Sequence, residues 1–172
     1  MEQDNEIINR VSNSALITFD LETYYQEGDR VLLDIKDQLY EGLILKEKDF
    51  REFIKSNNWS SYQDKLVAVT CSTDAILPTW AFMLIAIALR PYAKRVELGS
   101  LDDLEEILFR ETLSKVNWEQ FRDAKVIVKG CSKVNVPPSA YVFTVSRLQP
   151  IVSSLMFGEA CSTVPLYKRK AN

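Results

Sequence analysis

The sequence contains one pattern of residues twice, and this repeat constrains the fold more than any other feature. Phe50-Arg51-Glu52 recurs further along the chain as Phe109-Arg110-Glu111. Identity at spaced positions over such a length indicates an old duplication inside one compact domain, because two copies are too few for a solenoid. Further pairs keep the same offset or exceed it by a single position: Asn58-Trp59 with Asn117-Trp118, Asp64 with Asp123, Val67 with Val126, Cys71-Ser72 with Cys131-Ser132, and Pro91 with Pro150.

Both copies predict the same order of elements. Each has a helix, a short Val-rich run typical of a buried parallel strand, a Cys-Ser loop, a helix that opens at a proline, and a last strand. Strands are also expected before the first copy, over Ala15–Phe19 and Val31–Ile35. The alternation predicts an α/β fold with a mostly parallel sheet and flanking helices, built from two tandem copies of one α-β-α-β unit. The expected elements are Lys46–Asn57, Lys65–Thr70, the helix from Pro78 and Arg95–Leu98 in copy one, and Leu101–Lys115, Lys125–Lys129, the helix from Pro138 and Ser154–Phe157 in copy two.

A length of 172 residues fits one domain. We therefore expect a single domain with four parts. The N-terminal strands lie in residues 1–42, copy one in 43–99, copy two in 102–158, and a C-terminal tail in 159–172.

Composition excludes several classes of function. The chain has no histidine, which removes Ser-His-Asp and Cys-His catalysis and histidine-ligated zinc. Its net charge of -3 gives no basic face for nucleic acid. The one basic cluster, Lys168-Arg169-Lys170, is typical of a solvated tail.

No membrane association is expected. The longest uncharged run, Ala75–Leu89, is shorter than the roughly 20 residues of a membrane span and predicts a buried helix. Met1–Arg10 is acidic and polar, unlike a signal peptide. Three cysteines in such a chain favour the reducing cytoplasm.

The three cysteines are the best candidates for a site. Cys71 and Cys131 each follow a predicted strand, and Cys161 follows the last one. Because ligands of open α/β sheets bind outside the carboxyl ends of the strands, the three thiols are expected at one edge. Each cysteine is followed by serine.

Thiolates at one edge favour zinc, copper(I) or an iron–sulphur cluster, with three protein ligands and one open position. Asp74 is the preferred oxygen ligand, and Glu159 is the other candidate. Without metal, the same thiols suit a redox or sulphur-carrying site. The alternative is structural, since free cysteines are often small residues of the core.

Four segments carry a resemblance to a known family: Asn9-Arg10-Val11, the run 41–51, Thr70-Cys71-Ser72-Thr73-Asp74 and the run 158–167. They resemble an uncharacterised bacterial domain-of-unknown-function family of the DUF2480 type. The resemblance covers essentially the whole chain and implies an association with genes for iron–sulphur cluster assembly. The front half also resembles small sulphate-transporter or anti-sigma-antagonist domains, which bind partners and catalyse nothing.

These observations lead to a first hypothesis and two alternatives. The first is a cytoplasmic protein, accessory to iron–sulphur or thiol metabolism, with a metal, cluster or sulphur site at Cys71, Cys131, Cys161 and Asp74. The second is a non-enzymatic protein-interaction module, with protein partners or a second copy of itself and with cysteines that only pack. The third is an enzyme with a cysteine nucleophile and no histidine.

Overall fold

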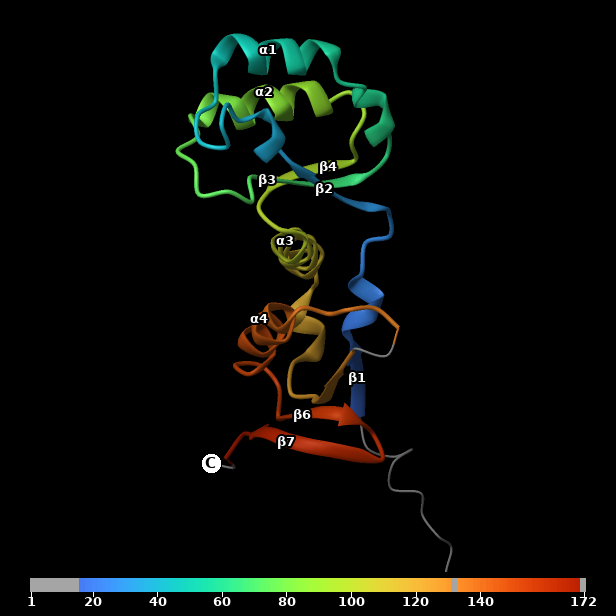
Figure 1. Ribbon diagram of the computed structural model, residues 1–172. Helices are drawn as coiled ribbons and strands as arrows, with labels where there is room; N and C mark the ends of the chain where they lie inside the picture. The colour runs from blue at the N-terminus through green and yellow to red at the C-terminus, as the bar shows by residue number, and fades with distance from the viewer. Residues whose placement is uncertain (1–15, 131–132, 171–172) are drawn as a thin grey trace, which may run out of the picture. The chain divides into compact units, whose positions relative to one another are not determined.

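The chain folds into two compact units. The computed structural model describes residues 16–130 and 133–170 (Figure 1). The central unit spans Gln26–Leu108, and the terminal unit joins Met1–Tyr25 to Phe109–Asn172. The predicted mixed α/β fold with mostly parallel strands is confirmed, but the described strands form two sheets instead of one. The expected single-domain organisation stays a prediction.

The central unit contains a three-stranded parallel sheet. Its strands are β2 (Arg30–Asp34), β3 (Leu66–Thr70) and β4 (Arg95–Leu98), in the order β2-β3-β4. All pairs are parallel. The first four residues of β3 are buried, as expected for an apolar run that is covered on both faces.

Helices cover both faces of the central sheet. Figure 1 shows α1 (Glu47–Ser56) and α2 (Thr79–Leu89) on the same side of the sheet. On that side, the core includes Phe50, Val67, Val69 and Ile85. On the other side, Leu104 and Leu108 of α3 (Leu101–Ser114) pack against Leu66 and Ala68.

The terminal unit contains a four-stranded sheet in the order β1-β5-β6-β7. β1 (Leu16–Asp20), β5 (Lys125–Lys129) and β6 (Ser154–Glu159) are parallel, and β7 (Ser162–Lys168) pairs with β6 in the antiparallel direction. Phe109 and Leu113 of α3 and Ala140 and Leu148 of α4 (Pro138–Leu148) belong to the core of this unit.

Strand β7 lies where the sequence predicted only a tail. Pro165 argues against a strand prediction here, since proline cannot donate a hydrogen bond to a neighbouring strand and is confined to edges and bulges of sheets. The structure provides both, because β7 is an edge strand with a bulge. Leu155 pairs with Tyr167 and Met156 with Pro165, which leaves Leu166 as the extra residue.

The two units contain elements that correspond at the offset of the sequence repeat. A 3₁₀ helix, η3 (Trp59–Tyr62) or η4 (Trp118–Phe121), precedes strand β3 or β5 in each unit. Asp64 and Asp123 follow these turns with φ angles of 60° and 59°. Aspartate is one of the few side chains that tolerate this left-handed conformation. The chain therefore makes the same unusual turn before both strands.

Candidate functional site

Cys71 lies directly after β3 and is partly buried. Its side chain packs against the apolar core beneath α1 and α2. Its Sγ lies 3.2 Å from the Thr73 Oγ1, and either atom can be the donor. This thiol therefore has an apolar side and one hydroxyl neighbour, an environment that suits a packing residue.

Ser72 ties the loop after β3 to the end of β2. Its hydroxyl donates to Asp34 Oδ2 at 2.5 Å, and its backbone N–H donates to Asp34 Oδ1 at 3.1 Å. The Lys36 backbone N–H donates to the same Oδ1 at 3.1 Å. Burial alone would raise the pKa of Asp34, but these hydrogen bonds and the Lys36 ammonium lower it.

The other predicted ligands do not join Cys71 in the described structure. Cys161 is exposed in the two-residue turn between β6 and β7, in the other unit. Asp74 is exposed, and Cys131 lies outside the described residues. Within residues 16–130 and 133–170, no group of three or more Cys, Asp or Glu side chains is arranged to hold a metal ion. The predicted three-cysteine site is thus without support from this part of the chain.

Charged side chains gather at the carboxyl edge of the terminal sheet. Lys129 Nζ, at the end of β5, lies 3.4 Å from Asp20 Oδ2 and 3.5 Å from Glu159 Oε1. The Glu159 carboxylate, and next the Asp20 carboxylate, raise the pKa of Lys129. Glu159, a candidate ligand from the sequence, is thus part of an ion-pair network that neutralises one lysine.

An apolar groove of about 250 Å³ lies in the central unit, between α2 and β4. Strand β4 is an edge of its sheet and pairs only with β3 among the described strands. Leu98 is 59% exposed at the rim, and Met83 is 60% exposed. The lining residues are Val69, Thr79, Phe82, Met83, Ala86, Val96, Glu97 and Leu98.

The terminal unit has the matching groove, and there a strand covers the edge. This groove of about 330 Å³ is lined by Val128, Tyr141, Val145, Phe157 and Leu166. The first four correspond, at the offset of the repeat, to Val69, Phe82, Ala86 and Leu98 of the central groove. Only Leu166 has no counterpart, because it comes from β7. The central groove thus shares four lining positions with the terminal groove but, among the described residues, has no lining residue from a covering strand.

Sequence reasoning missed this groove because it predicted a fully buried helix over Ala75–Leu89. In the structure α2 buries Ala81, Ile85 and Leu89, while Ile87 is 68% exposed. A helix that is apolar on all sides should be covered on all sides. The lack of any charge on α2 was therefore the signal for a surface that needs a partner. None of the helices among the described residues is long and apolar enough to cross a membrane.

The basic C-terminal cluster contributes to a groove of about 500 Å³ at the amino ends of β5 and β6. Lys125, Lys168 and Lys170 line it beside Met156 and Pro165. Arg169 also lines this groove. It pairs with the Asp123 carboxylate and donates to the Ile151 carbonyl, so it links the end of β7 to the rest of the unit.

Comparison with known proteins identifies a family but no activity. No solved structure matches the chain significantly. A family model described as a protein of unknown function matches residues 5–169, nearly the whole chain. The chain therefore belongs to the DUF2480 family of proteins of unknown function.

Proposed function

We propose that this chain is a non-enzymatic protein-interaction module that docks an extended protein segment at the open edge of β4. The groove beside β4 supports this proposal, because the equivalent groove of the terminal unit already holds such a segment. There, β7 pairs with β6 and adds Leu166 to the lining. The pairing of β7 with β6 is thus an intramolecular example of the strand pairing that we propose for a partner segment at β4.

The backbone of β4 is ready to accept a strand. The Arg95 N–H donates to the carbonyl of Lys65, the residue before β3. The Gly99 N–H donates to the carbonyl of Val69 in β3. Since alternate residues of a strand face opposite neighbours, the N–H and C=O groups of Val96 and Leu98 point to the open edge. Main-chain hydrogen bonds would supply affinity, and an apolar side chain in the groove would supply specificity.

The two grooves are most simply explained by duplication, so we propose that both units derive from one α-β-α-β ancestor. The left-handed Asp64 and Asp123 and the matching groove residues support this origin. In this account the copies have diverged at one edge. The terminal copy covers its groove with β7, whereas the central copy keeps its groove open for a partner.

A peptide with the sequence of Ser162–Lys168 tests the docking proposal. Fluorescence anisotropy of the labelled peptide should show saturable binding to the full chain. The substitution M83E should weaken binding at least about tenfold, which corresponds to about 1.4 kcal/mol, because Met83 lines the groove. A peptide with aspartate at the position of Leu166 should also bind more weakly.

The matched control is V142E. Val142 occupies the equivalent position on α4 and is 70% exposed, but it does not line the terminal groove. V142E should therefore bind the peptide as the unaltered chain does. Equal weakening by M83E and V142E, or no binding at all, would contradict docking at β4. Peptide exchange with β7 in the terminal unit would be insensitive to M83E.

The thiol hypothesis remains a second candidate, supported by the partial exposure of Cys71 and the exposure of Cys161. It requires Cys71, Cys131 and Cys161 to come together at one site, since three protein ligands are the usual minimum for zinc. Anaerobic purification followed by zinc and iron analysis tests it. Metal that is lost when all three cysteines are replaced by serine would support this candidate, and metal-free protein after reconstitution would end it.

A further inference from the structure

We infer that the segment docked at β4 is β4 of a second copy of this chain, paired antiparallel about a two-fold axis at Val96. The inference rests on the proposed docking edge and specifies its occupant. Two central sheets would then join into one continuous sheet across the β4 edges, which removes the unpaired edge in both copies.

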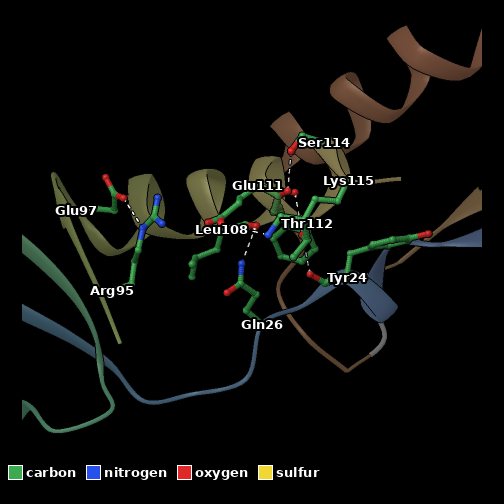
Figure 2. Close-up of polar contacts among 10 residues, drawn as sticks. Tyr24, Gln26, Arg95, Glu97, Leu108, Glu111, Thr112, Ser114 and Lys115 are labelled. Carbon is green, nitrogen blue, oxygen red and sulfur yellow. Dashed lines mark hydrogen bonds and ion pairs between the residues drawn. The ribbon is translucent and has the colours of Figure 1, made fainter. Parts of the chain in front are cut away.

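The charges of β4 are self-complementary in this register. Arg95 and Glu97 lie two residues apart, so their side chains share one face of the strand. Within one chain the Arg95 Nε lies 2.6 Å from the Glu97 Oε1 (Figure 2). In an antiparallel pair centred on Val96, Arg95 of each copy would stand opposite Glu97 of the other. Opposite charges at directly facing positions stabilise strand pairs, and like charges destabilise them.

The neighbouring register lacks this complementarity. When a two-fold axis relates two antiparallel copies of one strand, it must pass between the two copies of a single residue. An axis between two successive residues would make facing side chains lie on opposite sides of the sheet, whereas facing side chains lie on the same side. A pair centred on Glu97 would set two glutamates against each other, and a pair centred on Arg95 would do the same with two arginines. Only the register centred on Val96 sets each charge opposite its counter-charge.

The exposed side of α2 favours a second copy over an isolated peptide strand. Met83 and Ile87 are one helical turn apart and lie on the same side of α2, with Met83 at the groove. Strands in a sheet are about 4.8 Å apart, so two α2 helices that each lie above the junction of β3 and β4 would be about 10 Å apart. That is the usual distance of packed helices, so α2 of each copy would cover Met83 and Ile87 of the other.

The terminal unit differs from the central unit at the helix position that corresponds to Ile87. Its strand β6 is already covered by β7 and needs no second copy. Ser146 of α4 stands where α2 has Ile87. Both side chains are exposed, but the serine has no apolar surface to cover. The apolar residue thus occurs in the unit with the open edge, and the polar one occurs in the unit in which β7 pairs with β6.

Sedimentation equilibrium of the full chain tests the inference. The unaltered chain should be a dimer at about 100 μM, and M83E should be monomeric because it places a charge on the exposed side of α2 that the other copy would cover. V142E should remain a dimer. Circular dichroism shows whether each variant folds, and I87E, on the same exposed side of α2, replaces M83E in the test if M83E does not fold.

Charge exchange tests the register. R95E and E97R should each shift the dimer toward monomer, since each sets like charges opposite each other. The double variant R95E/E97R should dimerise again, because the exchanged pair is still self-complementary. A dimer that tolerates M83E, I87E and both single exchanges would overturn the inference.

The outcomes separate this inference from the docking proposal. A monomeric chain that binds the Ser162–Lys168 peptide at the groove would overturn the second copy as occupant and leave docking at β4 in place. A monomeric chain that does not bind the peptide would overturn both. A dimer with the predicted response to charge exchange supports both.

Discussion

Leu98 and Phe157 occupy the same position in the last parallel strand of their sheets, but among the described strands only Phe157 has one paired on its outer side. Phe157 pairs with Val164 of β7. Leu98 ends β4, which pairs only with β3 among the described strands. An unpaired edge next to an apolar groove exposes backbone polar groups and apolar side chains together, and proteins rarely leave such an edge uncovered.

The first prediction concerns the strand that covers the terminal groove. L166A should lower the free energy of unfolding by about 1 kcal/mol, because a half-exposed leucine contributes part of the usual burial energy. Leu166 is 49% exposed. Chemical denaturation measures the effect, and L166M, which keeps the apolar volume, is the control. Equal stability of L166A and the unaltered chain would show that Leu166 does not help to hold β7.

Much of the secondary structure could be predicted from local sequence. The observed strands over Arg95–Leu98 and Lys125–Lys129 match the predictions at both ends. The start of α3 at Leu101 was also predicted, and there Ser100 and Asp103 form reciprocal capping hydrogen bonds in the structure. These features depend on periodicity and on capping side chains, both of which are local.

The candidate groove could not be predicted in the same way. The groove is open only because β4, among the described strands, lacks a neighbour on its outer side. Which strands become neighbours depends on pairing between segments that are distant in the sequence. Strand β7 was missed because Pro165 interrupts its pattern. Without β7, the sequence does not show that Phe157 lies beside a covering strand and Leu98 does not. The strand ends do carry Cys71 and Cys161 as predicted, but the chain places these two cysteines in different units.

The second prediction concerns the repeated left-handed turn. D64V should lower the free energy of unfolding by about 1–2 kcal/mol, because the left-handed conformation is costly for a side chain with a branched β carbon. Asp64 has a φ angle of 60°. D64G should match or exceed the stability of the unaltered chain, since glycine adopts this angle freely. A D64V variant as stable as D64G would contradict the backbone explanation.

The third prediction concerns the pH dependence of the link between β2 and the Cys71 loop. The pKa of Asp34 is lowered in the folded chain despite the opposing effect of burial, and Ser72 provides two of the hydrogen bonds responsible. A lowered pKa contributes stability at pH above the ordinary aspartate value near 3.8. That contribution disappears as the pH falls through the lowered value of the folded chain.

Substitution of Ser72 tests this link. S72A should raise the pKa of Asp34 toward its ordinary value and reduce the acid-dependent part of the stability. NMR titration of the Asp34 carboxyl carbon measures the shift. T73A is the control, because the Thr73 hydroxyl contacts Cys71 and not Asp34. An unchanged Asp34 titration in S72A would mean that the Ser72 hydroxyl does not lower this pKa and that the backbone N–H groups of Ser72 and Lys36, with the Lys36 ammonium, do.

The fourth prediction concerns thiol accessibility. In a chain with Cys131 replaced by serine, iodoacetamide should modify Cys161 faster than Cys71 in the native state. Cys161 is exposed in a turn, whereas Cys71 is partly covered by the core. Mass spectrometry of the two tryptic peptides gives the rates, and the rates in denaturant provide the reference. Faster modification of Cys71 would point to a reactive thiol and revive the nucleophile hypothesis.

The most direct test of the central claim is amide hydrogen exchange at Val96 and Leu98 across a dilution series. Both N–H groups face the open edge of β4, so they should exchange slowly when a second copy or the Ser162–Lys168 peptide is bound and rapidly when the chain is dilute and free. Leu155 and Phe157, whose edge β7 already covers, should stay protected throughout. Rapid exchange of Val96 and Leu98 at every concentration, with and without the peptide, would contradict docking at β4.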